Sequence, residues 1–225
     1  DMKTSFFEDD MNAIVEIANT GFPVNGIFIP KVNNYDEIIF AHELLANAKS
    51  FIEIVPMIET KEGMENLENI LIADVTHDRF TKIHYGHFDY CLDANLWPFP
   101  DPCHIDFWNL ITPMAKLIHS FKKTYIHTPF PFPNNSDLFW STADYLQTLF
   151  PDENPWICTL NAELSNSKPP DEKSLISLVE LDNSKKFGIN EANNIQADFL
   201  SGRANKRSFG VSSGRFIPPH QYFAA

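Results

Sequence analysis

The sequence predicts an α/β fold in which helices cover a parallel β-sheet. Short apolar runs alternate with helix-like segments of about 10 to 15 residues from residue 10 to about residue 125, a pattern typical of parallel sheets. The chain has 225 residues and 44% hydrophobic content, enough for one sizeable core. A doubly wound sheet and a barrel both fit. No glycine-rich fingerprint follows the first strand, so a dinucleotide-binding fold has no positive support.

Two helix–strand pairs are predicted first. Residues 10–18 carry apolar side chains at helical spacing, and Gly21 breaks the pattern before the apolar strand 26–30. Residues 36–48 repeat the helical spacing, and residues 51–58 form the next apolar run. We therefore expect two neighbouring strands with a helix between them.

The following elements continue the alternation. Thr60 is the predicted N-cap of the next helix. Residues 80–85 form a strand, 106–121 a helix, and 124–127 a strand that leads into the aromatic–proline run Phe130–Pro133. The density of Phe in this run suggests an exposed lid or subunit contact. Beyond residue 133 the pattern is less regular, and the expected elements are a helix at 137–150, a strand at 156–160, a polar loop at 166–173, an apolar segment at 175–181 and a helix at 191–200.

Composition restricts the partners. A formal net charge of −13 and a pI near 4.9 would repel phosphate backbones and anionic lipid, so we expect neither nucleic acid nor a membrane as partner. No apolar stretch approaches the roughly 20 residues of a membrane span. The three cysteines are few and lack metal-ligand spacing, which suggests reduced thiols in a cytoplasmic protein. The chain opens at Asp1 without an initiator Met, so we expect an upstream segment.

Two carboxylates end apolar runs. Glu59 follows the run 54–58, and Asp89 follows the turn that begins at Gly86. Oxygen ligands from two strand ends suit a hard divalent cation such as Mg²⁺, and catalytic groups gather at the strand carboxyl ends of parallel barrels. Taken singly, each carboxylate is as readily explained as a capping or surface group.

Three motifs in order carry a family resemblance: Gly26-Ile27-Phe28-Ile29-Pro30-Lys31-Val32, Pro56-Met57-Ile58-Glu59-Thr60 and Tyr85-Gly86-His87-Phe88-Asp89-Tyr90. They resemble the citrate lyase beta subunit and HpcH/HpaI aldolase superfamily, which includes malyl-CoA lyase-like proteins. The tail Gly214-Arg215-Phe216-Ile217-Pro218-Pro219-His220 is similar to the end of the CoA-linked branch. The resemblance implies a TIM (β/α)8 barrel with a C-terminal helical extension.

The resemblance also implies a function. Glu59 and Asp89 would bind Mg²⁺, with Mn²⁺ as an alternative ion. The activity would be that of a Mg²⁺-dependent carbon–carbon lyase or aldolase acting on a 2-oxo acid adduct or a 3-hydroxyacyl-CoA thioester through a metal-stabilised enolate. The expected partners are a small-molecule 2-oxo acid or acyl-CoA, and other copies of the chain in a homo-oligomer, a trimer or hexamer.

The chain departs from the family in two ways. The family's substrate-binding Arg lies on a strand before the Pro-Lys-Val strand, but no Arg precedes Pro30 here; by alignment it would fall just before Asp1. We therefore expect the first strand–helix units of the barrel upstream, a partial TIM barrel with the metal site at residues 1–165, and a C-terminal extension at 166–225 that acts as a lid or subunit-interface segment. The CoA-linked branch's Ile-His-Pro-type segment has no counterpart near residues 156–162, which argues against a standard CoA substrate.

Lys31 and His127 are the predicted catalytic residues. Lys31, at a strand end, would lie near the substrate carboxylate; a Schiff-base role is less favoured, and a solvated lysine is the alternative. His127 ends the predicted strand 124–127, and it is expected at the same end of the sheet as the metal site. His84 and His87 lie at the end of the strand 80–85 and just after it, before Asp89, and a structural role is favoured for each. His220, in the tail, is also expected to be structural.

Two competing hypotheses remain open. One is a non-catalytic or accessory citrate lyase-like protein that keeps the barrel as a binding or assembly module. The other is a metal-dependent 2-oxo acid aldolase that uses no CoA.

Overall fold

Two units make up the chain in the computed structural model. It describes residues 2–73, 79–96, 100–159 and 161–171, and the backbone of residues 210–212 and 215–217. The first unit contains residues 1–86 and 117–126, and the second contains residues 87–116 and 127–225.

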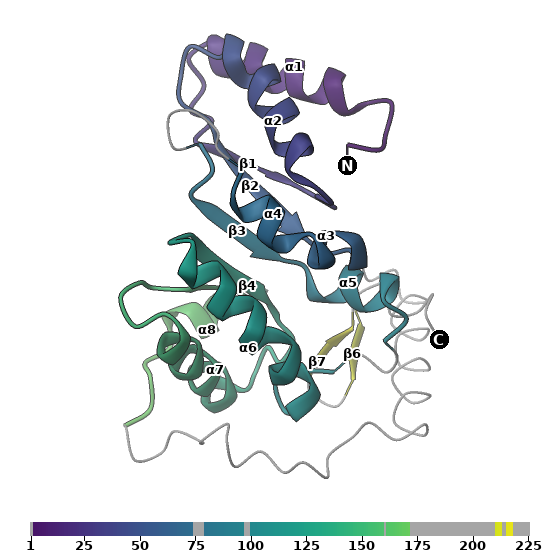
Figure 1. Ribbon diagram of the computed structural model, residues 1–225. Coiled ribbons are helices and arrows are strands. Elements are labelled where there is room, and N and C mark those ends of the chain that lie inside the picture. The colour runs from purple at the N-terminus through teal and green to yellow at the C-terminus, as the bar shows by residue number, and fades with distance from the viewer. Residues whose placement is uncertain are drawn as a thin grey trace. The chain divides into compact units, whose positions relative to one another are not determined.

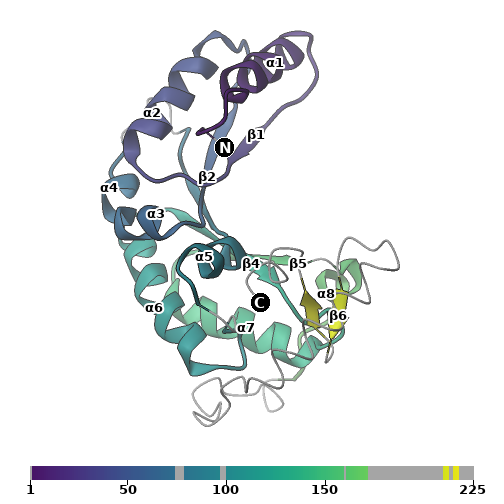
Figure 2. The same cartoon turned by 90° about the vertical axis from the view of Figure 1, so that its right-hand side faces the viewer.

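The first unit is a parallel sheet with helices beside it. Its strands, in sheet order, are β1 (Gly26–Ile29), β2 (Glu53–Ile58), β3 (Lys82–Tyr85) and the start of β4 (Thr124–Phe130). Its helices are α1 (Phe7–Asn19), α2 (Tyr35–Leu44), the 3₁₀ turn η1 (Leu45–Asn47), α3 (Lys61–Glu65), α4 (Leu67–Leu71) and the end of α6 (Ile105–Ser120). Figures 1 and 2 show α2, α3 and α4 along one face of β1, β2 and β3.

Strand register in this unit determines which residues meet at the carboxyl ends. Ile29 of β1 pairs with Pro56 of β2, and Ile58 of β2 pairs with Tyr85 of β3. Because all these pairings are parallel, the residues that follow each strand emerge at the same edge of the sheet.

Helix starts in the first unit follow the expected capping chemistry. The Thr60 hydroxyl accepts the backbone N–H of Gly63 at 3.0 Å, which confirms Thr60 as an N-cap. Asn34 caps α2 in the same way by accepting the N–H of Glu37 at 3.2 Å. The predicted helix after Thr60 is broken at Asn66 into the short helices α3 and α4.

The second unit contains the start of α6, the end of β4, and the elements α5 (His87–Asp93), α7 (Ser136–Leu149), β5 (Trp156–Thr159) and α8 (Ala162–Asn166). β5 neighbours β4 in the sheet order. The strands β6 (Gly210–Ser212) and β7 (Arg215–Ile217) pair antiparallel.

An aromatic core fills the second unit. Phe107 and Phe150 are fully buried, and Trp108 is 4% exposed. The expectation that the aromatic–proline run is exposed is wrong for Phe130. β4 continues through this residue, whose side chain is 1% exposed and lies edge-on to Phe139 at 5.3 Å between ring centroids. Phe130 therefore belongs to the core of this unit.

Several predictions fall outside the described residues. These are the apolar segment 175–181, the helix 191–200, the side chains of the 214–220 tail, and most of the proposed C-terminal extension. The division at residues 165 and 166 stays a prediction. In the part of the chain that is described, no helix combines the length and apolar character needed to cross a bilayer.

Candidate functional site

The candidate site of the first unit lies at the carboxyl ends of β1, β2 and β3. The register places the segments beginning at Lys31, Glu59 and Gly86 next to one another. Two backbone hydrogen bonds extend the strand pairing past the strand ends: the N–H of Val32 donates to the carbonyl of Met57 at 3.2 Å, and the N–H of Gly86 donates to that of Ile58 at 3.0 Å. The strand end that carries Glu59 is thus hydrogen-bonded to the neighbouring segment on each side.

Glu59 is a buried carboxylate held by a backbone donor. Glu59 is 5% exposed, and its Oε1 accepts the N–H of Lys31 at 3.1 Å. A buried carboxylate needs hydrogen bonds or positive charge to offset lost hydration. The structure thereby brings together two of the predicted residues, through the backbone of Lys31.

Gly86 leaves room for that carboxylate. A Cβ at residue 86 would lie 2.4 Å from Glu59 Oε2 and 2.7 Å from Glu59 Cβ, well inside any tolerated contact. Gly86 has no positive φ among the described backbone angles, so glycine is required here for space. The sequence indicates Gly86 only as a turn residue, because its steric role depends on the side chain of Glu59 beside it.

Lys31 adopts an unusual backbone conformation. Its φ of 56° lies in the left-handed region, where a residue with a Cβ is disfavoured by about 1–2 kcal/mol. The residue itself is exposed. This conformation coincides with donation of the Lys31 N–H to Glu59, as expected where surrounding contacts hold strain at a site.

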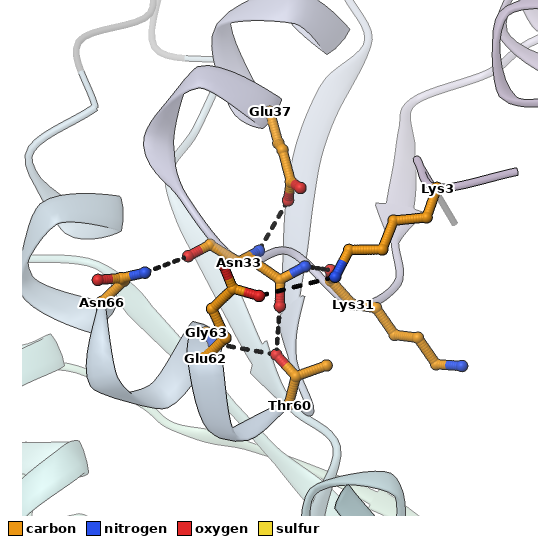
Figure 3. A network of polar contacts seen from close by, with 8 residues as sticks. All are labelled: Lys3, Lys31, Asn33, Glu37, Thr60, Glu62, Gly63 and Asn66. Carbon is orange, nitrogen blue, oxygen red and sulfur yellow. Dashed lines mark hydrogen bonds and ion pairs between the residues drawn. The ribbon is translucent and has the colours of Figure 1, made fainter.

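A network of polar contacts surrounds the turn after β1 (Figure 3). At its centre is Asn33, which is 1% exposed. Its side chain contacts the carbonyl of Lys31 and the hydroxyl of Thr60, and its backbone contacts Glu37 and Asn66. Asn33 is not among the residues predicted from the sequence. The signal was Asn33-Asn34 followed by Glu37, a spacing that marks the start of a helix.

Asp89 lies in the second unit, on the first turn of α5, and is partly exposed. Glu59 lies in the first unit, so each of these carboxylates is placed within its own unit. The role of Asp89 as a metal ligand stays a prediction.

His87 and His127 are buried among aromatic rings in the second unit. His87 donates from Nε2 to the carbonyl of Pro100 at 2.6 Å and is 3% exposed. His127 is fully buried, and its ring is nearly parallel to Trp108, with centroids 6.3 Å apart. This burial favours a structural role for His127, and its predicted catalytic role is untested.

His84 lies on β3 in the first unit, 6% exposed and edge-on to Phe28. Burial lowers the pKa of His84 to about 4, so its ring is neutral near pH 7. The favoured structural role of His84 agrees with this environment.

The donor set fits a hard cation better than a soft one. Among the described residues, no three His, Cys, Asp or Glu side chains gather as a metal cage. Mg²⁺ does not require such a cage, because one or two carboxylates commonly hold it together with water and substrate oxygens. Glu59 is a carboxylate of this kind at the carboxyl end of β2.

Comparison with known proteins gives a consistent fold. Models of known protein families and curated protein sequences give no match. Malate synthase of Haloferax volcanii, solved as a pyruvate/acetyl-CoA ternary complex, is 13% identical with a TM-score of 0.66, over 98% of this chain and 67% of that one. A citrate lyase from Burkholderia xenovorans LB400 is 10% identical with a TM-score of 0.58, over 98% and 67%.

CitE of Mycobacterium tuberculosis, solved in complex with magnesium and acetoacetate, is 12% identical with a TM-score of 0.54, over 72% of this chain and 62% of that one. This chain has the fold of the citrate lyase β-like barrels. The TIM-barrel fold class predicted from the sequence is therefore confirmed. The likeness at 10–13% identity concerns the fold.

Proposed function

We propose that this chain carries the metal site of a Mg²⁺-dependent carbon–carbon lyase or aldolase of the citrate lyase β-like type. The observation that carries the proposal is Glu59, a buried carboxylate at the carboxyl end of β2 with one oxygen held by the Lys31 N–H. The fold is that of proteins solved with magnesium and acetoacetate or oxaloacetate, which supports a 2-oxo acid adduct or 3-hydroxyacyl-CoA thioester as substrate.

Glu59 and Asp89 would hold the metal ion, Mg²⁺ or Mn²⁺. The ion would supply Lewis-acid stabilisation of the negative charge that develops when a carbon–carbon bond next to a carbonyl breaks. The protein's contribution is to keep Glu59 fixed before substrate arrives, since preorganised groups cost no reorganisation during reaction.

Lys31 has two separate tasks in this proposal. Its backbone N–H orients Glu59 at 3.1 Å. Lys31 is an exposed residue, and its ammonium would supply positive charge near the substrate carboxylate, as expected from its place at a strand end. A homo-oligomer, a trimer or hexamer, also remains part of the proposal.

The first experiment measures metal affinity by calorimetry, titrating Mn²⁺ and then Mg²⁺ into the protein in the presence of oxaloacetate or pyruvate. Glu59→Gln keeps the size of the side chain and an acceptor for the Lys31 N–H but removes the charge. Glu53→Gln makes the same change at a part-buried carboxylate at the opposite end of β2, which accepts hydrogen bonds from Thr81 and Lys82, and serves as the matched control. We expect loss of binding in Glu59→Gln alone; unchanged binding there would refute the metal site.

A second experiment identifies the reaction class. Malyl-CoA and free 4-hydroxy-2-oxo acids are offered in parallel, and the released products are measured. Cleavage of the thioester supports the CoA-linked activity, and cleavage of the free acid alone supports the CoA-independent aldolase.

One observation favours an accessory, non-catalytic protein as the second candidate. Among the residues whose side chains are described, Arg79 is the only arginine; it is 8% exposed and donates from Nη1 to the carbonyl of Leu45 at 3.2 Å. It is thus committed to the interior of the first unit. Metal and 2-oxo acid binding without product formation from either substrate would favour this candidate.

A further inference from the structure

We infer that the hydrogen bond between Asn33 and Thr60 is a positioning device for Glu59, acting through the backbone of Lys31. The inference rests on the proposed function in one respect: it assumes that the position of Glu59 matters for binding a divalent cation. Asn33 and Thr60 are positioning residues in this account, since they act through Lys31 and the peptide next to Glu59.

The bonding capacities of the groups determine the direction of each hydrogen bond. The Thr60 hydroxyl accepts the N–H of Gly63 at 3.0 Å, so its single proton is available for Asn33 Oδ1 at 2.6 Å. Asn33 Nδ2 then donates to the carbonyl of Lys31 at 2.9 Å. The amide of Asn33 thus bridges the turn that carries Lys31 and the turn that carries Thr60 (Figure 3).

This bridge holds Lys31 in its disfavoured conformation. The φ of 56° at Lys31 turns its N–H onto Glu59 Oε1, while its carbonyl is held by Asn33. At the other end, Thr60 directly follows Glu59 in sequence, so its bond to Asn33 restrains the peptide beside the carboxylate. Both the donor and the acceptor of the Lys31–Glu59 bond are therefore fixed by one side chain.

The surroundings of Asn33 restrict its own freedom. Its backbone N–H donates to Glu37 Oε2 at 2.7 Å, and its carbonyl accepts from Asn66 Nδ2 at 3.0 Å. Gly63 lies so close that a Cβ there would meet the carbonyl of Val32 at 2.3 Å. A buried polar side chain with its groups satisfied in this way rigidifies its neighbourhood.

Three variants isolate the bridge. Asn33→Ala removes both side-chain bonds, and Thr60→Val removes the hydroxyl while keeping the shape. Thr60→Ser keeps the hydroxyl and the helix cap, so it should restore wild-type behaviour. Asn34→Ala is the matched control, because it removes the neighbouring N-cap bond to Glu37 without touching Lys31 or Glu59.

The first readout needs no metal. Hydrogen exchange at the Lys31 amide is followed by NMR in the metal-free protein, with thermal unfolding recorded for each variant. We expect exchange about 10-fold faster or more in Asn33→Ala and Thr60→Val, because local opening becomes easier when the bridge is lost. Thr60→Ser and Asn34→Ala should keep the wild-type rate.

The second readout is Mn²⁺ affinity. Loss of an outer-shell partner typically lowers metal affinity by about 10- to 100-fold, and we expect this in Asn33→Ala and Thr60→Val. The double variant should lose less affinity than the two single losses combined, because both variants remove the Asn33–Thr60 bond. If Asn33→Ala fails to fold, the part-exposed Thr60 still decides the question through Thr60→Val and Thr60→Ser.

Faster exchange together with weaker Mn²⁺ binding supports the inference. Wild-type exchange and affinity in both variants would overturn it, as would an equal loss in Asn34→Ala. If the wild-type protein binds no Mn²⁺, the proposed function fails, while the exchange rates still show whether the bridge holds Lys31 against Glu59.

Discussion

Replacing Gly86 with alanine probes the geometry of the site with a single methyl group. The added Cβ would lie 2.4 Å from Glu59 Oε2, 2.7 Å from its Cβ and 3.3 Å from its Cδ, whereas ordinary contact begins at 3.4 Å. The carboxylate must therefore retreat by about 1.0 Å and the Cβ by about 0.7 Å, or the strands must separate. The end of the side chain cannot simply rotate away, because its Cβ is also in the way.

We expect two effects from Gly86→Ala. Overpacking of this kind typically costs about 1–3 kcal/mol of unfolding free energy, measurable by urea denaturation. Displacement of the carboxylate should weaken Mn²⁺ binding about 10- to 100-fold, measurable by calorimetry.

Gly21→Ala is the control for Gly86→Ala. Gly21 has a φ of 93°, and a Cβ added there would meet no atom within 4 Å. Alanine at this position therefore strains the backbone without crowding any side chain. It should lower stability and leave Mn²⁺ affinity unchanged. Wild-type affinity in Gly86→Ala, or an equal loss in Gly21→Ala, would refute the reasoning.

Three further predictions concern buried groups. Burial lowers the pKa of His84 from 6.5 to about 4. The free energy of unfolding should therefore be fully retained above about pH 6.5 and fall by up to about 3 kcal/mol as pH drops toward 4. Urea unfolding of His84→Gln should show a correspondingly weaker pH dependence. Burial raises the pKa of the Cys91 thiol, so at about pH 8 native Cys91 should alkylate more slowly than Cys103 by mass spectrometry, and equal rates would contradict its placement. Phe130→Ala should lower the unfolding free energy by about 3–5 kcal/mol without changing oligomeric state in gel filtration, whereas dissociation without destabilisation would restore the interface hypothesis.

Periodic patterns predicted most of the described elements because one face of each helix or strand is buried. Residues 10–18 and 137–150 lie within or nearly within α1 and α7, and the strand ending at Ile58 is β2. The extension of β4 to Phe130 was missed because prolines follow His127 and suggested a strand end.

The carboxylate at residue 59 could be predicted because it directly follows an apolar run and a recognisable motif. The restraints on it could not, because they depend on strand register. That register brings Lys31 beside Glu59 across 28 positions and Thr60 beside Asn33 across 27. The left-handed conformation of Lys31 was likewise unpredictable, since lysine has no intrinsic preference for positive φ.

The most direct test of the central claim is Mg²⁺ binding in the presence of oxaloacetate, measured by calorimetry on the wild-type protein and on Glu59→Gln and Asp89→Asn. The proposal predicts saturable binding by the wild type. It predicts that Mg²⁺ affinity falls by about 100-fold or more in each variant, a larger loss than is usual for residues that only hydrogen-bond to a metal ligand. Absence of binding by the wild type, or equal binding by all three proteins, would contradict a metal site at Glu59 and Asp89.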